Sequence, residues 1–428
     1  MANGEVKRSE TAPSYWLVLL SLISAAIGYI TSITVAQILG ADGFEHYAVA
    51  IASLAILSTI AEAGTGKFAL KAWPEYITTG QLGLASGFVR FALTAVVVIS
   101  LVILLVAATG ESVEGNQFGD HAFGIAVCFL PGVALAGAGI DFVMASRRAI
   151  MGSFISRLFI PLLTFVTILF CAQLFSSFDS SWAAACFGMS SCIGASIAIV
   201  VFLRTSGQKL RSVTPAYQVR HWTWECTKYL SLAMLVTLTF RISLLVLEVL
   251  PVSEIEVSLF AAATETGCLI LLLSKSTDKY YQPYISVMLM QQSWDEAVTM
   301  RRQRYKKIGI ACLLFLGIVV FFGRRILGLY GEEFKDGYLA LCFVAFGAST
   351  WTVFSLAPAY LKFVAKDQFV FLTNVFGAFA MATLTFTLGM HWGATGAAFA
   401  FCVVLCAVSL ANLFVATKHF AGIRQTIE

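Results

Sequence analysis

The chain has 428 residues, of which 59% are hydrophobic and only 12% are charged, and its mean hydropathy is +0.84. Soluble domains carry about 25% charged residues, and disordered chains combine low hydrophobicity with high charge, so both classes are excluded. The net charge of +4 does not indicate a nucleic-acid-binding surface, and the apolar residues would fill about twelve membrane helices of ~20 residues each.

Apolar segments follow one another along the chain and are separated by short polar loops. The first is longer than the apolar core of a signal peptide and lacks a small-residue cleavage site, so we expect it to be retained. Prolines within three of the segments predict kinked helices, because proline removes a backbone hydrogen bond. The predicted spans are residues 15–39, 44–66, 83–109, 121–145, 153–175, 182–203, 228–250, 256–275, 308–323, 338–361, 368–390 and 394–416.

Lysine and arginine are distributed unevenly between the two sides of these segments. If the N-terminus is cytoplasmic, 23 of the 28 basic residues fall in cytoplasmic loops or at the cytoplasmic ends of helices, and three fall in outside loops. Cytoplasmic loops of membrane proteins carry an excess of Lys and Arg. The charge pattern therefore predicts twelve spans with both termini in the cytoplasm.

The segments repeat along the sequence. Those starting at 15, 44, 153 and 182 correspond to those starting at 228, 256, 368 and 394, with offsets of 212 to 215 residues. Six spans in each half predict two lobes inserted in the same sense, as in transporters built from parallel repeats. The predicted parts are a cytoplasmic tail (1–14), an N-lobe (15–203), a cytoplasmic linker (204–227), a C-lobe (228–417) and a second cytoplasmic tail (418–428).

The linker contains two tryptophans beside basic residues. We expect it to form an amphipathic helix on the cytoplasmic surface, with Trp222 and Trp224 at the level of the lipid headgroups. Nine of the ten cysteines lie in apolar stretches and are expected to be small buried hydrophobic residues, while Cys226 lies in the linker.

Motifs of enzymes and cofactor sites are missing. The sequence has no phosphate-binding G-x-x-x-x-G-K-[ST], no H-E-x-x-H and no C-x-x-C, and its five histidines are scattered. We predict no cofactor, no metal and no enzyme activity. An intramembrane transferase is kept as the remote alternative.

Ionisable groups inside a span usually mark a function, because the hydrocarbon does not tolerate them. Arg241 and Glu265 lie on consecutive antiparallel segments, each about 14 Å from the outer end. They could form an ion pair that fixes helix packing. Alternatively, Arg241 lines a central cavity and binds an anionic headgroup, and both interpretations could hold.

Three further charged residues lie near the cytoplasmic ends of their segments. Lys275 and Asp278 either mark the membrane interface or belong to a basic patch where a phosphate first docks. Glu62 either pairs with Lys67 or Lys71, or it faces the other lobe, since the repeat offset places it opposite Ser274.

Arg90 and Arg157 lie a few residues into their segments from the cytoplasmic side. Long arginine side chains at such positions can extend to the interface. The same residues are also candidates for phosphate binding.

Four stretches resemble a known family. They are residues 39–48 (LGADGFEHYA), 62–66 (EAGTG), 327–334 (LGLYGEEF) and 392–398 (WGATGAA). These stretches and the two-lobe plan are similar to the polysaccharide transporters, or Wzx-like oligosaccharide flippases, of the multidrug/oligosaccharidyl-lipid/polysaccharide (MOP) exporter superfamily. The resemblance implies an all-α, MATE-like fold with twelve transmembrane helices in two six-helix lobes around a central cavity.

The resemblance also implies a function. A flippase of this family moves polyprenyl-diphosphate-linked oligosaccharide repeat units across the bacterial inner membrane by alternating access, for surface or exopolysaccharide biosynthesis. Its partners would be the lipid-linked oligosaccharide, membrane lipids, a polysaccharide polymerase and chain-length proteins, with no nucleic acid, and the protein would be a monomer.

The charged residues receive roles on this basis. Arg241, supported by Lys275, Arg90 and Arg157, would bind the diphosphate. The carboxylates for ion coupling would be Glu62, Glu265 or Asp278. The alternative within the same superfamily is an ion-coupled multidrug antiporter, which would need a buried acidic site.

Overall fold

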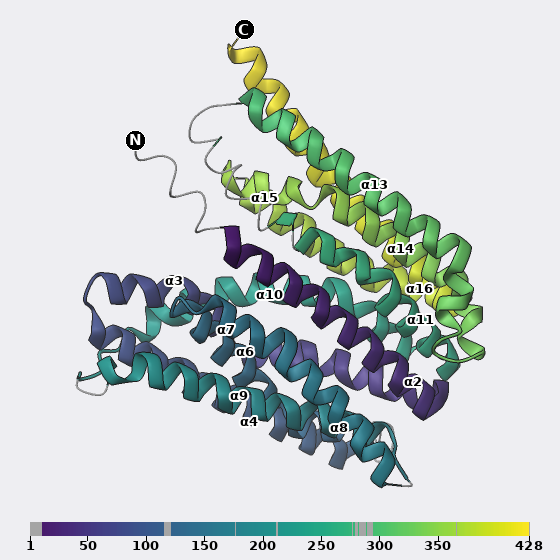
Figure 1. Cartoon of the computed structure of the whole chain (residues 1–428), viewed down its shortest axis with the longest axis horizontal. Coiled ribbons are helices and arrows are strands. Elements are labelled where there is room, and N and C mark those ends of the chain that lie inside the picture. The colour runs from purple at the N-terminus through teal and green to yellow at the C-terminus, as the bar shows by residue number, and fades with distance from the viewer. Residues whose placement is uncertain are drawn as a thin grey trace. The chain divides into compact units, whose positions relative to one another are not determined.

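The computed structural model describes residues 11–114, 121–175, 177–210, 213–275, 277–278, 281, 288, 294–364 and 366–427 (Figure 1). All regular secondary structure in these ranges is helical. The chain divides into two compact units. The first comprises Met1–Thr31 and Ile38–Arg241, and the second comprises Ser32–Gln37 and Ile242–Glu428.

The first unit holds the helices of the N-terminal half. Within it α6 packs against α9, α3 and α4, so α6 lies at the centre of the unit. Its elements are most of α2 (Thr11–Ala61), α3 (Thr65–Thr78), α4 (Leu82–Glu114), α5 (His121–Cys128), α6 (Leu130–Ala145), α7 (Ala149–Phe154), the π-helical η1 (Ile155–Phe159), α8 (Ile160–Leu174), α9 (Ser180–Leu210) and most of α10 (Val219–Val249).

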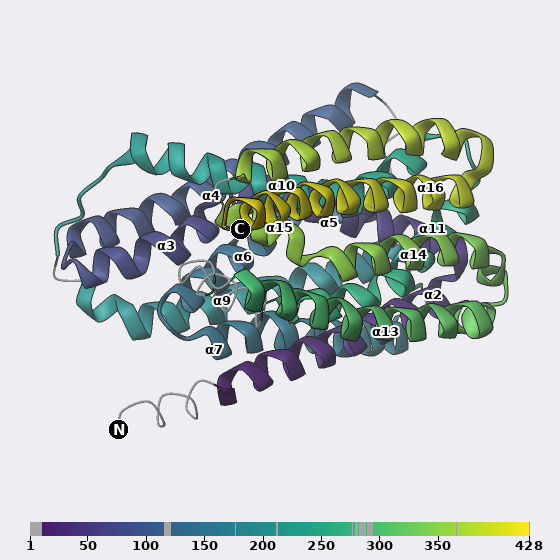
Figure 2. The ribbon, with the colours of Figure 1, turned by 90° about the horizontal axis from the view of Figure 1, so that it is seen from above.

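The second unit is built around α14, which packs against α13, α11 and α16. The two halves of α16 run side by side in opposite directions (Figure 2). Besides the end of α10, the unit contains α11 (Glu254–Gly267), η2 (Cys268–Ile270), α13 (Trp294–Leu327), η3 (Glu333–Gly337), α14 (Tyr338–Phe354), α15 (Leu356–Phe363) and α16 (Asp367–Ile427).

Two of these helices each contain two spans. α2 is broken at Gly40, where φ is 72°, and α16 is broken at Gly393, where φ is 52°. Both angles lie in the left-handed region, which glycine adopts without the steric penalty of a side chain. Within the described residues, ten helices or bent pairs are long and apolar enough to cross a membrane, and dividing α2 and α16 at these glycines gives the twelve predicted spans.

The regular α-helix is interrupted just before each of the three prolines that were expected to kink their helices. Pro131 follows a 49° bend between residues 122–128 and 130–145. Pro161 follows the π-helical turn η1, and Pro358 follows the break between α14 and α15. Proline is tolerated in the first turn of a helix, where its missing N–H has no partner in any case. The breaks therefore come just before the prolines.

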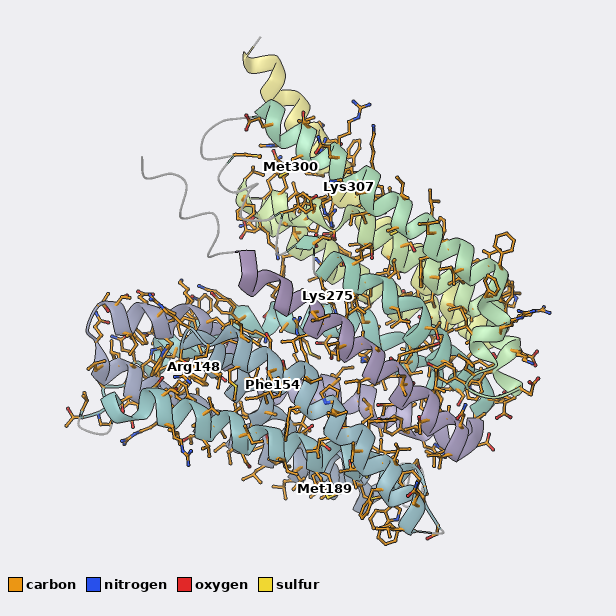
Figure 3. All side chains as sticks on the ribbon, in the orientation of Figure 1. Arg148, Phe154, Met189, Lys275, Met300 and Lys307 are labelled. Carbon is orange, nitrogen blue, oxygen red and sulfur yellow. The ribbon has the colours of Figure 1, made fainter. Side chains whose placement is uncertain are left out.

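Large apolar side chains cover the outer surfaces of the spans. On α4, Leu105 and Val106 are each 64% exposed, and on α13 Leu313 is 70% exposed. Phe154 and Met189 lie at the surface in the same way (Figure 3). Apolar faces on helices of this length are typical of contact with lipid. The chain is thus a multi-pass membrane protein.

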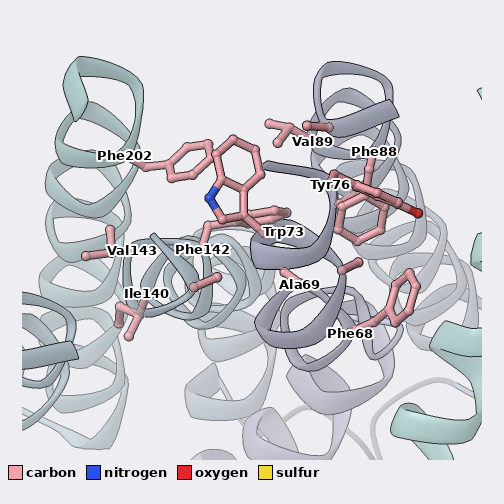
Figure 4. Packing of buried hydrophobic residues seen from close by; sticks show 14 of the residues in the cluster. Phe68, Ala69, Trp73, Tyr76, Phe88, Val89, Ile140, Phe142, Val143 and Phe202 are labelled. Atoms are coloured by element: carbon pink, nitrogen blue, oxygen red, sulfur yellow. The ribbon is translucent and has the colours of Figure 1, made fainter. Parts of the chain in front are cut away.

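An aromatic cluster fixes the beginning of α10 in the first unit. Figure 4 shows Phe68, Trp73, Tyr76, Phe88, Phe142 and Phe202 packed together from α3, α4, α6 and α9. Trp222 completes the cluster: it is 0% exposed, and its Nε1 donates a hydrogen bond of 2.9 Å to the Tyr76 hydroxyl.

This cluster corrects the expectation that Trp222 lies at the level of the lipid headgroups. Trp222 is buried in protein and does not lie among the headgroups, and Cys226 is also buried. Residues 219–227 are the first turns of α10, continuous with the span that follows them. Phe88 and Phe91 of α4 pack against the Trp222 ring, and Tyr76 of α3 accepts its hydrogen bond, so the indole finds its apolar and polar partners within the protein. Trp224, on another face of the helix, is 66% exposed.

Candidate functional site

The turn between α2 and α3 carries the first group of charges. Ala63 and Gly64 have φ of 50° and 70°, two successive left-handed residues. A Cβ on Gly64 would lie 2.3 Å from the carbonyl oxygen of Cys226, so the turn packs directly on the backbone of α10. The Thr65 hydroxyl donates a 2.8 Å hydrogen bond to the Glu62 carbonyl, which closes the turn. This tight turn places Glu62 and Lys67 on the same side, toward α6.

Glu62, Lys67 and Asp141 form what we call the Glu62 cluster. The Lys67 ammonium donates a hydrogen bond to Asp141 Oδ2 at 2.7 Å, and the Asp141 side chain is 7% exposed. Two glycines make room for the carboxylates. A Cβ on Gly137 would lie 1.9 Å from Glu62 Oε1, and one on Gly66 would lie 2.7 Å from Asp141 Oδ2. The charges are therefore packed closely against the backbones of α3 and α6.

The electrostatics of this cluster are unbalanced, because two carboxylates share one ammonium. Burial raises the pKa of Glu62 to about 7; the Lys67 charge opposes this rise, and the Asp141 charge adds to it. Burial by itself would lower the pKa of Lys67, but Asp141 and Glu62 together raise it above its usual value. The cluster can thus take up or release a proton on Glu62 near neutral pH while Lys67 stays charged.

A second cluster lies in the other unit and centres on a fully buried arginine. Arg304 of α13 is 0% exposed. Its guanidinium donates to Asp278 Oδ1 at 2.5 Å, to the Ser355 hydroxyl at 2.8 Å and to the Val353 carbonyl at 3.0 Å. The ring centroid of Tyr281 lies 5.9 Å from its Cζ. We call this group the Arg304 cluster; it joins α13 to the segment after α11 and to the break between α14 and α15.

Asp278, predicted as an ion-coupling carboxylate, is therefore held by Arg304. Burial raises the pKa of Asp278, and the neighbouring Arg304 charge opposes that rise. Sequence reasoning missed Arg304, which stood out only as one of several basic residues in a cytoplasmic stretch. Its neighbours Arg302 and Lys306 have the same local appearance but are exposed. Nothing in the sequence pattern distinguishes the buried arginine.

The residues predicted to bind the diphosphate are spread over several helices. Arg90 is exposed on α4, and Lys275 is exposed among the helical residues that follow η2 (Figure 3). Arg157 lies in the π-helical turn η1 and donates a hydrogen bond to the Ser21 hydroxyl of α2. A π-helical turn interrupts the regular helical hydrogen bonds and is frequent at functional sites.

Arg241 and Glu265 were the most prominent charges of the sequence. Arg241 is half-buried in α10, within the first unit, and Glu265 is exposed on α11, within the second. The predicted ion pair between them, and the predicted contact of Arg241 with a headgroup, stay predictions.

Metal and redox chemistry find no support in the part of the chain that the structure describes. No three His, Cys, Asp or Glu side chains gather there in a way that could hold a metal ion. All ten cysteines are free, and most are at least partly buried, although Cys128 is exposed.

No known family profile matches this chain, and no curated protein matches it. Several solved structures match the chain over almost its whole length. A multidrug resistance MATE transporter of the MOP superfamily, in its inward-facing conformation, is similar with a TM-score of 0.74 at 11% identity, over 96% of this chain and 99% of that one.

Two further structures extend the comparison. The lipid II flippase MurJ, inward closed, matches with a TM-score of 0.72 at 11% identity, over 95% of this chain and 89% of that one. A MOP-superfamily transporter from Pyrococcus furiosus, whose binding pocket is described as having reverse polarity, matches with a TM-score of 0.61 at 11% identity, over 96% of both chains. These likenesses confirm the predicted fold class, an all-α membrane protein with the MATE/MOP fold.

Proposed function

We propose that this protein is a flippase that moves polyprenyl-diphosphate-linked oligosaccharide repeat units across the bacterial inner membrane, for surface polysaccharide biosynthesis. The observation that carries the proposal is the likeness to a lipid II flippase over 95% of the chain. A cargo of this class has a charged, hydrated headgroup and an apolar tail. The protein has to enclose the headgroup in a polar cavity while the tail stays in the bilayer. This transport requires neither a cofactor nor a bond-breaking step.

The cationic residues within the helices support a diphosphate as the charged part of the cargo. Arg241 lies in the middle of a span and is half-buried there, and charged residues at this depth usually face the protein interior or a water-filled cavity. Guanidinium groups bind phosphate oxygens through two parallel hydrogen bonds. We assign Arg241 as the main phosphate contact, with Lys275, Arg90 and Arg157 along the path from the cytoplasmic side.

The Glu62 cluster supports proton coupling as the driving force. Glu62 changes charge near neutral pH, next to a Lys67–Asp141 pair that stays in place. Asp278 is less suited to this role, because Arg304 engages it. We therefore assign Glu62 as the coupling carboxylate ahead of Asp278 and Glu265. Alternating access of the two lobes, with both termini in the cytoplasm, would complete the cycle in a monomer that works beside a polymerase and chain-length proteins.

A multidrug antiporter is the second candidate, because a MATE transporter is at least as similar in fold. That function would require an organic cation as the cargo and an acidic residue to bind it. Uptake of a fluorescent cation into vesicles, abolished by Glu265→Gln, would favour the antiporter. No such transport is expected of a flippase for an anionic headgroup.

A clean deletion in the native host tests the proposal. Cells without the protein should accumulate lipid-linked oligosaccharide on the cytoplasmic leaflet and lose the corresponding surface glycan. Normal surface glycan, in a strain with no redundant transporter, would contradict the function.

Complementation of that strain tests the role of Arg241. Arg241→Ala should restore less than a tenth of the export at normal protein levels, because charge-assisted hydrogen bonds are worth about 1.5–3 kcal/mol each. Lys307→Ala, which removes an exposed cation of α13, is the matched control and should restore export fully. Full export by Arg241→Ala would remove Arg241 from the site but would leave the function standing.

A further inference from the structure

A groove lies beside the beginning of α10, in the first unit. Its volume is about 1090 Å³, and it is formed by the end of the loop that precedes α10 and by the first two turns of the helix. Its walls combine aromatic, cationic and hydroxyl groups. The lining residues are Tyr217, Gln218, Val219, Arg220, His221, Thr223, Trp224 and Thr227.

The groove carries an excess of positive charge. Arg220 is exposed in its lining, and its guanidinium makes no hydrogen bond or ion pair with any described residue. The nearby acid, Glu225, is already engaged, because Lys228 Nζ lies 2.5 Å from its Oε1. Lys71 and His221 also interact electrostatically with Glu225. Among the described residues, Arg220 is thus a cation without a counter-charge.

The groove also has the composition of a membrane interface. Trp224 is 66% exposed and Tyr217 is 54% exposed, and the Lys228 ammonium lies 5.4 Å from the centroid of the Trp224 ring. Exposed Trp and Tyr concentrate at the level of the lipid headgroups, because their rings are apolar at one end and polar at the other.

The length of α10 places the groove at the same level. The helix has 31 residues and is about 46 Å long, whereas the hydrocarbon core of a bilayer is about 30 Å thick. Its continuous apolar stretch begins near Leu230, so the turns that line the groove precede the hydrocarbon. The buried Trp222, bonded to Tyr76, holds these turns in a fixed position.

We propose that this groove binds the phosphate of an anionic phospholipid from the surrounding leaflet. Arg220 is suited to contact the phosphate through two parallel hydrogen bonds, and Trp224 and Tyr217 are suited to pack beside the glycerol and the first carbons of the acyl chains. The site anchors the beginning of α10 to the membrane surface. It is independent of the proposed cargo, since it requires only a lipid headgroup with a net negative charge.

The test is a binding measurement on the purified full-length protein in neutral detergent. Phosphatidylglycerol is titrated and the bound lipid is counted by native mass spectrometry, with phosphatidylcholine as the uncharged comparison. An interfacial cation is worth about 1 kcal/mol toward anionic lipid, so Arg220→Gln should weaken binding roughly 5-fold and Arg220→Glu roughly 30-fold. Arg220→Lys should retain most of the affinity.

Lys307→Glu makes the same change of charge at an exposed site on α13 and should leave the affinity within about twofold of the wild type. An unchanged elution volume and thermal midpoint of the Arg220 variants ensure that the fold is intact. Wild-type affinity in Arg220→Glu would overturn the proposal, as would equal binding of phosphatidylcholine. Displacement of the lipid by millimolar inorganic phosphate would show that the groove takes free phosphate and would overturn its assignment to a lipid.

Discussion

The Glu62 cluster and the Arg304 cluster occupy corresponding places in the two halves of the sequence. Lys67 and Asp278, each in the segment after the second span of its half, are 211 positions apart, and Asp141 and Val353 are 212 apart. In each unit, the segment after the second span is linked by side chains to the fourth span of that half, which is α6 in the first unit and α14 in the second. In the first unit, the Lys67 ammonium donates a hydrogen bond to Asp141 of α6. In the second, Arg304 donates both to Asp278 and to the Val353 carbonyl near the end of α14.

The two clusters balance their charges differently. The Arg304 and Asp278 charges are matched one to one, and two further guanidinium bonds reach a hydroxyl and a carbonyl, while Nε of Arg304 is buried without a hydrogen-bond partner among the described residues. In the Glu62 cluster one ammonium faces two carboxylates, and Glu62 makes no side-chain hydrogen bond within the described residues. A matched buried pair holds structure together, whereas an unmatched carboxylate can respond to pH. The comparison therefore assigns a structural role to one cluster and a proton-dependent role to the other.

The largest effect is expected from breaking the matched pair. Asp278→Ala leaves Arg304 buried without its counter-charge, which should destabilise the protein by about 3–5 kcal/mol. Thermal unfolding in detergent or nanodiscs measures the loss. A double variant, Asp278→Ala with Arg304→Met, should recover much of it, because the unpaired buried charge is then gone. A single variant as stable as the wild type would show that the Arg304 cluster does not hold the unit together.

A smaller effect, with a definite sign, is expected from pH. The pKa of Glu62 is raised to about 7 by folding, so the folded state binds the proton more tightly than the unfolded state, whose pKa is about 4.3. This contribution is complete below pH 4 and is lost as the pH rises through 7, by roughly 3–4 kcal/mol in total. Glu62→Gln should remove that part of the pH dependence and should be more stable than the wild type at pH 8.

Transport should follow the same titration. We expect wild-type flipping to change with a midpoint near pH 7 and Glu62→Gln to be insensitive to pH in this range. Glu75→Gln serves as the control, because it removes an exposed carboxylate of α3 that has no proposed role in transport. Identical pH profiles for the wild type and Glu62→Gln would show that the Glu62 cluster takes no part in proton coupling.

The smallest effect concerns the glycine that makes room for Glu62. Gly137→Ala would place a methyl group 1.9 Å from Glu62 Oε1, so the carboxylate must move, at a cost of about 1–3 kcal/mol. Combining it with Glu62→Ala should restore most of the stability, since the colliding atoms are removed. A thermal midpoint that falls further in the double variant than in Gly137→Ala would contradict this packing. Gly309→Ala, on α13, meets nothing within 4 Å and should be neutral or slightly stabilising.

The spans were predictable from the sequence because they depend on local composition. Each span is an unbroken apolar stretch, and its ends are marked by charge, glycine or proline. Even the division of α2 and α16 coincides with the predicted loops, near Gly40 and Gly393. The fold class followed from the number of spans and from their repeat.

The clusters were not predictable, because they depend on contacts between distant parts of the chain. Lys67 meets Asp141 across 74 positions only because Gly64 lets the turn approach α10 and Gly66 lets α3 approach α6. Trp222 was misplaced for a similar reason, since its partners Tyr76, Phe88 and Phe91 come from two other helices. Local sequence shows that a residue is charged or aromatic, but the partners that bury it are a tertiary property.

Reconstitution in vesicles shows whether the purified protein moves a lipid-linked oligosaccharide across a bilayer. The purified protein is placed in vesicles with a labelled polyprenyl-diphosphate oligosaccharide in the outer leaflet, and the fraction that becomes protected from an added glycan-degrading enzyme is followed with time. We predict rapid protection with the wild type, little with Arg241→Ala and wild-type rates with Lys307→Ala. Protection no faster than in protein-free vesicles, together with uptake of an organic cation by the same preparation, would contradict it.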